Sequence, residues 1–173
     1  MRSIALAIAA VLLLASCSDD PEPIEPTASP PAEPTAAPTL PAKAEEETPE
    51  GAIAFVAHWI ETFNFAVNVS AVEGFKSLNE PGCEGCKSYE DEIARLNRNG
   101  AEVRDFSWIG GKASLTEERR LEVAIRSSDY QVRDSEADDW ATVKGARQQL
   151  GFELTWSDGR WKVHQLYLPE GAK

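Results

Sequence analysis

The chain has 173 residues, 42% of them hydrophobic, and its 29 acidic and 17 basic residues give a formal net charge of −12. So large an excess of acid leaves no basic stripe that would neutralise phosphates, so we do not expect nucleic acid as a partner. The 123 residues from Gly51 to Lys173 suit a single domain.

Residues 1–16 form a predicted lipoprotein signal peptide. Arg2 precedes the apolar run 4–14, which is too short to span a bilayer, and small residues lead up to Cys17. In this motif the Cys17 thiol is joined to diacylglycerol, and the new amino terminus can gain a further acyl chain such as palmitate. We therefore expect a lipid-anchored protein on the extracytoplasmic face of the cell membrane. The alternatives are an ordinary secretory signal with an incidental cysteine, or an uncleaved anchor.

Residues 17–50 comprise the lipidated Cys17 and a predicted disordered spacer rich in Pro, Ala, Thr and Glu. The tract has no aromatic residue, and Ile24 and Leu40 are its only large apolar side chains, so it buries too little surface to offset the entropy of ordering. At about 3 Å per residue it would hold the next domain up to roughly 100 Å from the lipid. The alternative is a proline-rich ligand at Pro31-Ala32-Glu33-Pro34.

Residues 51–173 form the predicted folded domain, which opens with helices. Apolar side chains recur at three- and four-residue steps over 52–67, and Thr48-Pro49-Glu50 supplies a cap, a first-turn proline and an acid for a start there. A second helix is expected over 70–78, capped by Ser70, and a third over 86–98, with Tyr89, Ile93 and Leu96 on one face.

Beyond Gly100 the pattern changes to alternating runs rich in aromatic and β-branched residues, which predicts strands. Four are expected, over 101–109, 119–133, 145–157 and 160–168, with Gly110-Gly111 between the first two. Asp158-Gly159 is a strong signal for a tight hairpin between the last two. One face of this sheet should be buried, with Trp161, Val163 and Gln165 together on one side of the last strand.

Helices followed by an antiparallel meander predict an α+β domain, in which a curved sheet of about four strands wraps the long first helix. In its order of elements, the chain resembles uncharacterised actinobacterial lipoproteins with a nuclear transport factor 2-like (NTF2-like), or SnoaL-like, domain. The likeness rests on the opening Thr48-Pro49-Glu50-Gly51-Ala52, on Cys83-Glu84-Gly85-Cys86 and on the hairpin from Trp156 to Val163, within about residues 48–168. It implies a conical fold with a concave pocket, used for enzymes, binding domains and dimer interfaces alike.

Cys83 and Cys86 are expected to form a disulfide, because thiols tend to oxidise outside the cytoplasmic membrane and the bridge would clamp the turn before the third helix. One alternative is a redox-active pair, since a thiolate would be stabilised at a helix start. Another is a zinc site, for which His58 and His164 are the available imidazoles.

No nucleophile, base and orienting group appear at a recognisable spacing, so we expect no catalytic, cofactor or metal site. Asp105 and Tyr130 are candidates to face a cavity. We interpret Trp108, Tyr130, Trp140 and Trp156 as core or rim aromatics, with a ligand cage as the alternative. The expected function is noncatalytic binding of an envelope protein or a small ligand; the alternative is an exported SnoaL-like enzyme acting on a small apolar molecule. A homodimer is left open.

Overall fold

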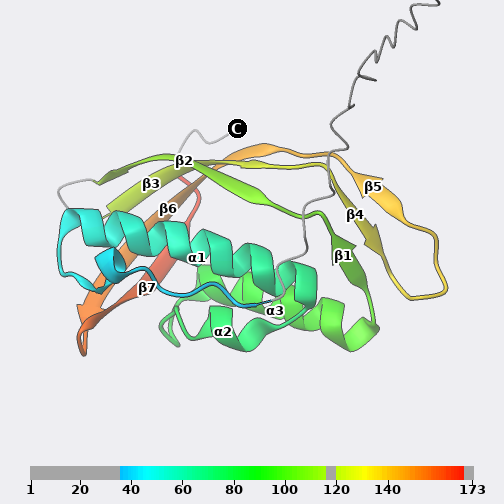
Figure 1. Cartoon of the computed structure of the whole chain (residues 1–173), viewed down its shortest axis with the longest axis horizontal. Helices are drawn as coiled ribbons and strands as arrows, with labels where there is room; N and C mark the ends of the chain where they lie inside the picture. Colours follow the sequence, from blue (N-terminus) through cyan, green and yellow to red (C-terminus); the bar gives the residue numbers. More distant parts are fainter. Residues whose placement is uncertain (1–35, 116–119, 170–173) are drawn as a thin grey trace, which may run out of the picture. The chain divides into compact units, whose positions relative to one another are not determined.

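The computed structural model describes residues 36–115 and 120–169. Cys17, the signal peptide and residues 17–35 of the spacer lie outside the described residues. Four helical segments pack on antiparallel strands, so the expected α+β class is confirmed. Figure 1 shows the strands arching over the helices, with α1 running along beneath the sheet.

The helices are the short 3-10 helix η1 (Ala42–Glu45), α1 (Pro49–Val69), α2 (Val72–Lys76) and α3 (Glu84–Asn99). The predicted start of the first helix is confirmed, because the Thr48 hydroxyl accepts the Gly51 N–H at 3.0 Å and Pro49 occupies the first turn. The predicted cap at Ser70 is wrong: this residue ends α1 in the left-handed region, with φ of 52°, and donates its N–H to the Ala66 carbonyl.

The packed part of the chain begins before Gly51, the boundary expected from composition. The side chain of Ala44 in η1 is buried in the core, and Leu40 packs against the core. The indole of Trp161 donates to the Glu46 carbonyl at 2.9 Å. At Gly51 a β-carbon would lie 2.1 Å from that same carbonyl oxygen, so only glycine allows this approach. A proline- and alanine-rich composition hides such a contact because small side chains carry little hydrophobic signal.

The strands form two antiparallel sheets, ordered β2-β3-β6-β7 and β1-β4-β5. Their bounds are β1 Glu102–Arg104, β2 Trp108–Leu115, β3 Arg120–Ser127, β4 Tyr130–Arg133, β5 Ala141–Val143, β6 Arg147–Ser157 and β7 Arg160–Tyr167. The first two predicted strands are each broken by a bend, which gives β1 and β2, and β3 and β4. A further bend separates β5 from β6. These bends carry one end of the strand layer down toward α3 (Figure 1).

Two irregularities correct the predicted strand pattern. Gly110 and Gly111 lie inside β2, where the register with β3 shifts between Gly110 and Ala113. The register between β6 and β7 also shifts, between Glu153 and Leu154. Beyond this shift the alternation of β7 is reversed, so Leu166 is buried where the sequence pattern had placed Gln165. The predicted hairpin is confirmed, since Asp158 and Gly159 have φ of 52° and 72° between Ser157 and Arg160.

The core centres on Trp59 of α1, which is fully buried among Phe63, Phe75 and Phe152. Its indole N–H donates to the Asn79 side chain at 2.8 Å, which satisfies the one polar atom of the ring. The segment around Asn79 also covers the edge of β7, through backbone bonds of 3.0 Å from Val163 to Leu78 and 2.9 Å from Glu80 to Val163.

Candidate functional site

An apolar pocket of about 620 Å³ lies between α1, α3 and the bent end of the strand layer. Five aromatic rings, each from a different segment, line it: Phe63, Tyr89, Phe106, Trp108 and Tyr130. Aliphatic side chains of α3, β1, β4 and β5 complete the wall. The volume lies within the range of small-molecule sites, and an apolar wall with few polar groups is their usual composition.

The five rings pack against one another in a continuous cluster. Trp108 lies 4.4 Å from Phe63 and 5.5 Å from Tyr89 between ring centroids, the latter edge to face. Phe106 links this group to Tyr130, whose ring stands edge to face at 5.2 Å. Edge-to-face contacts fix ring orientations as well as burying apolar area, so the wall should hold its shape without a ligand.

Two asparagines of α1 hold the first residue of β2 and the bend before it, where two of these rings lie. The Asn64 amide donates to the Trp108 carbonyl at 2.9 Å, and its oxygen accepts the Trp108 N–H at 2.7 Å. One helical turn later Asn68 makes the same pair of bonds with Phe106, at 2.8 and 3.2 Å. The asparagines thus replace a neighbouring strand at the bend, and they orient Phe106 and Trp108 toward the pocket.

The other bends are held by polar side chains as well. The Ser128 hydroxyl donates to the Asp105 carbonyl at 2.8 Å and accepts the Ser107 N–H at 3.1 Å. Asp129 accepts the Gly145 N–H at 2.9 Å and the Lys144 ammonium at 2.7 Å. The backbone bond from Gly145 and the Lys144 charge together lower the pKa of Asp129. These contacts join the bends between β1 and β2, between β3 and β4, and between β5 and β6 into one crease next to the pocket.

The charged residues that line the pocket are solvent-exposed, and most are paired. On α3 the Arg95 guanidinium donates to both carboxylate oxygens of Glu92, at 2.6 and 2.8 Å, which lowers the pKa of Glu92. Lys144 is bound to Asp129, and Asp134 is exposed at the end of β4. The Arg95 guanidinium also interacts electrostatically with Asp134. The polar groups therefore lie at the opening of the pocket, while its interior is apolar.

Two phenol groups in the wall have hydrogen-bonding capacity to spare. Neither the Tyr89 nor the Tyr130 hydroxyl has a hydrogen-bond partner within residues 36–115 and 120–169. Burial raises the pKa of Tyr89, so this phenol stays protonated at neutral pH and keeps a hydrogen to donate. Tyr130 was expected from the sequence as a candidate to face a cavity; Tyr89 was expected only on one face of its helix, with Ile93 and Leu96.

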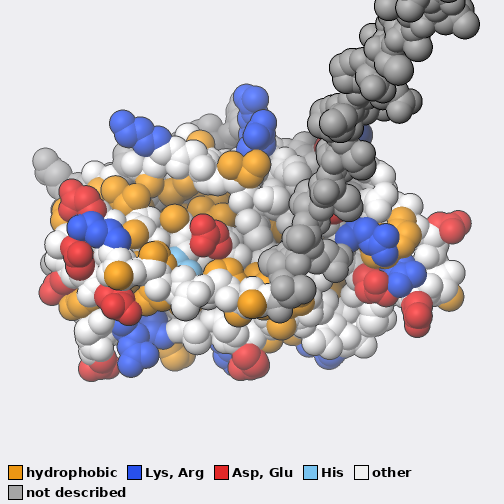
Figure 2. All heavy atoms as spheres, viewed as in Figure 1, with side chains coloured by type: hydrophobic (Ala, Val, Ile, Leu, Met, Phe, Trp, Pro, Cys, Tyr) orange, Lys and Arg blue, Asp and Glu red, His pale blue; other side chains and the backbone are white. Residues whose placement is uncertain are grey.

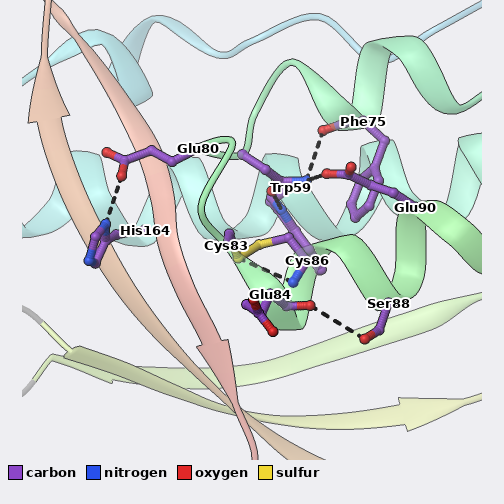
Figure 3. The surroundings of a disulfide bond; sticks show 10 residues. Trp59, Phe75, Glu80, Cys83, Glu84, Cys86, Ser88, Glu90 and His164 are labelled. Carbon is purple, nitrogen blue, oxygen red and sulfur yellow. Dashed lines mark hydrogen bonds and ion pairs between the residues drawn. A yellow bond between two sulfur atoms is a disulfide. The ribbon is translucent and has the colours of Figure 1, made fainter.

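The cysteine pair lies apart from this pocket. Cys83 and Cys86 are joined by a disulfide at the start of α3, and both are buried (Figure 3). The Cys83 sulfur accepts the Cys86 N–H at 3.2 Å, so Cys83 serves as the helix cap. Buried sulfurs are poorly placed for thiol exchange, which weighs against the redox alternative. The described part of the chain contains no group of three or more His, Cys, Asp or Glu side chains placed to hold a metal ion.

The two histidines and Asp105 also lie outside the pocket. His58 is buried on α1, where burial lowers its pKa and Thr62 is its hydrogen-bond partner at 3.4 Å. Asp105 is exposed, with a left-handed φ of 63°, and contributes only its carbonyl to the crease.

His164 is exposed on β7 and bonds Glu80 at 2.7 Å (Figure 3). This bond raises the pKa of His164. The same bond, with a second from Thr155, lowers the pKa of Glu80. The imidazolium therefore adds stability that is complete below its ordinary pKa of 6.5 and is lost as pH rises through the raised folded value. The carboxylate adds stability that is complete above its ordinary pKa of 4.5 and is lost as pH falls through the lowered folded value. The pair is strongest in weakly acidic solution.

The remaining aromatic candidates have structural contacts. Trp156 and Trp161 pack edge to face across the hairpin, with centroids 5.1 Å apart. Trp140 lies against two guanidiniums, with Arg104 at 3.4 Å and Arg133 at 4.8 Å from its ring centroid. Of the four aromatics considered from the sequence, Trp108 and Tyr130 line the pocket, and Trp140 and Trp156 do not.

Solved structures of similar fold include the intermembrane space region of the chloroplast protein ARC6, with 15% identity and a TM-score of 0.54 over 71% of this chain and 97% of that one. Another is a putative scytalone dehydratase from Novosphingobium aromaticivorans DSM 12444, with 13% identity and a TM-score of 0.43 over 70% and 85%. An NTF2-like protein with a cystatin-like fold, also from Novosphingobium aromaticivorans, has 12% identity and a TM-score of 0.42 over 70% and 84%. At these identities the likeness concerns the fold alone.

A comparison with curated proteins found no match. A family match extends over residues 24–167 and so includes part of the tract assigned to the spacer. Because it spans most of the sequence, the chain belongs to the family described as "Family of unknown function (DUF6318)".

Proposed function

We propose that this chain is a noncatalytic binding protein, anchored by lipid on Cys17 to the extracytoplasmic face of the cell membrane, whose domain holds a small molecule in the aromatic pocket. The observation that carries the proposal is the pocket itself, about 620 Å³ lined by five ordered rings. Exposed apolar surface is unfavourable in water, and a contiguous apolar surface of this kind marks binding grooves in many proteins.

The placement of the titratable groups supports a noncatalytic role. His58 and His164 line neither the pocket nor its opening. The acid and base on α3, Glu92 and Arg95, neutralise each other, and general acid–base catalysis needs groups free to exchange protons with a substrate. On the face drawn in Figure 2, acidic and basic side chains are interspersed among apolar ones, which suits a small apolar ligand better than nucleic acid.

The sequence before the domain supports the anchoring part of the proposal. The motif ending at Cys17 is that of a lipoprotein signal, and a spacer would carry the domain away from the membrane. Since residues from Leu40 onward pack on the domain, the proposed spacer shortens to residues 18–39. At about 3 Å per residue, 22 residues reach at most about 65 Å.

Native mass spectrometry of the full chain, purified from the cell envelope, tests the proposal. We expect a small-molecule adduct that is lost in Val143→Trp, because the larger side chain fills the pocket from β5. Val69→Trp is the matched control, since Val69 is exposed at the end of α1. An adduct-free wild-type protein, or an adduct equally retained in Val143→Trp, would contradict the proposal, and conversion of the bound molecule on incubation would favour the enzyme alternative.

A further inference from the structure

We infer that the pocket selects an uncharged, ring-bearing molecule whose polar group is bound by the Tyr89 and Tyr130 hydroxyls. This inference rests on the proposed function and specifies the class of ligand. It is carried by three properties of the described residues: the shape of the aromatic wall, the pairing of the charges around it, and the two phenol groups without partners.

The wall favours rings over flexible chains. Trp108 and Phe63 are tilted by 42° at 4.4 Å, and Tyr89 and Tyr130 stand edge to face with Trp108 and Phe106. A planar ligand gains stacking or edge contacts with such a wall, and it loses fewer rotatable bonds on binding than an acyl chain does. A ring system of two or three fused rings fits well within about 620 Å³.

The charges around the pocket disfavour an anionic ligand. Both basic residues in the lining are engaged, since Arg95 is bound through two bonds to Glu92 and Lys144 to Asp129. An anion entering the apolar interior would lose its hydration and find no unpaired cation. Asp134 at the opening adds repulsion.

A cationic ligand has more in its favour, because aromatic rings attract cations and Asp134 lies nearby. The rings, however, are packed against each other through their edges and faces, so they form a wall and not an open cage. The other acid in the lining, Glu92, already holds Arg95. A cation would therefore enter an apolar volume without a free carboxylate inside it.

The phenols supply the polar contact that an uncharged ligand needs. Tyr89 comes from α3 and Tyr130 from β4, so two separate elements each contribute a phenol to the lining of the pocket. Because the pKa of Tyr89 is raised by burial, its hydroxyl remains a donor over the physiological range. A carbonyl or amide on the ligand matches these groups without bringing a charge into the interior.

Three isosteric probes test the inference: 2-naphthamide, 2-naphthoate and 2-naphthamidinium, which share a ring system and carry charges of 0, −1 and +1. Their affinities are measured by isothermal titration calorimetry on the full chain in lipid nanodiscs, with empty nanodiscs as the blank. We expect 2-naphthamide to bind about tenfold or more tightly than either charged probe. The double variant Tyr89→Phe/Tyr130→Phe should weaken 2-naphthamide about tenfold. Tyr167→Phe, which removes the remaining tyrosine hydroxyl of the chain outside the pocket, should leave its affinity unchanged.

The outcomes separate this inference from the proposed function. If 2-naphthoate or 2-naphthamidinium binds as tightly as 2-naphthamide, and Val143→Trp abolishes that binding, the pocket binds small molecules but the inferred class is wrong. Equal loss of affinity in Tyr167→Phe and in the double variant would overturn the role of the two hydroxyls. If none of the probes binds and the purified chain carries no adduct, the proposed function and the inference fall together.

Discussion

The pairing of Asn64 with the sheet edge gives a quantitative test of how the pocket is held open. Asn64→Ala removes two hydrogen bonds, of 2.9 and 2.7 Å, to the backbone of Trp108. At a net 0.5–1.5 kcal/mol per bond, the expected loss in the free energy of unfolding is about 1–3 kcal/mol. The site is only part-buried, so water can reach the freed backbone groups and we add no further penalty.

Asn64→Asp provides a nearly isosteric probe of the same contact. The carboxylate still accepts the Trp108 N–H, but its second oxygen faces the Trp108 carbonyl and has no hydrogen to donate. Protonation restores that donor, so the folded state raises the pKa of the new carboxyl. The deficit relative to the wild type should therefore be smallest below about pH 4, the ordinary pKa of Asp, and should grow as pH rises through the raised value.

Urea unfolding at several pH values measures both variants, and binding of 2-naphthamide reports on the pocket. Asn97→Ala is the matched control, because Asn97 makes a single exposed bond of 2.8 Å to the Ser70 carbonyl. If Asn64→Ala is no less stable than Asn97→Ala, or if the deficit of Asn64→Asp does not change with pH, the asparagines do not hold the bend and the argument is refuted.

Three further predictions concern other parts of the chain. Replacing His164 by Ala should lower the urea midpoint at a pH of about 5.5 and have a smaller effect at about 8.5, because the bond to Glu80 weakens as the imidazole deprotonates; equal effects at both values would contradict this. The double variant Cys83→Ser/Cys86→Ser should lose about 2 kcal/mol of unfolding free energy, since the closed loop is short, and the untreated chain should have a mass two units below its reduced form; free thiols in the untreated chain would refute the disulfide. Cys17→Ala should abolish incorporation of labelled palmitate, whereas the double variant should keep it; label retained in Cys17→Ala would disprove lipidation there.

The features that sequence alone predicted are those fixed by local signals. The start of α1 follows from the cap and proline at Thr48 and Pro49, and the last hairpin from Asp158 and Gly159, whose backbone conformations are set by their immediate neighbours. A bend, by contrast, depends on partners far along the chain. The Asn64 amide lies 44 residues from the Trp108 carbonyl that it binds. The alternation of apolar and polar residues over 101–109 therefore does not indicate the bend between β1 and β2.

The contrast between local signals and distant partners also explains which parts of the pocket the sequence predicted. Tyr130 and Trp108 were recognisable as aromatic residues on strands, but whether an aromatic lines a pocket or the core depends on the curvature of the sheet, which the bends determine. The pairing of the charged side chains at the opening of the pocket could not be predicted from the sequence either. Lys144 and Asp129 lie on different strand ends, 15 residues apart, and only the crease brings them together.

A lipid anchor at Cys17, as proposed, would pull on a part of the domain that does not line the pocket. The chain enters the domain through η1, which packs on α1 and on β7. Next to η1, the Trp161 indole donates a hydrogen bond to the Glu46 carbonyl. The pocket uses α1 only from Phe63 onward, more than three helical turns later. A pull on the spacer from an anchor at Cys17 would therefore load the buried Ala44 and the Trp161 contact first. Because the aromatic wall is held by a different set of bonds, from Asn64 and Asn68, we expect tension on the proposed tether to leave the proposed ligand binding unchanged.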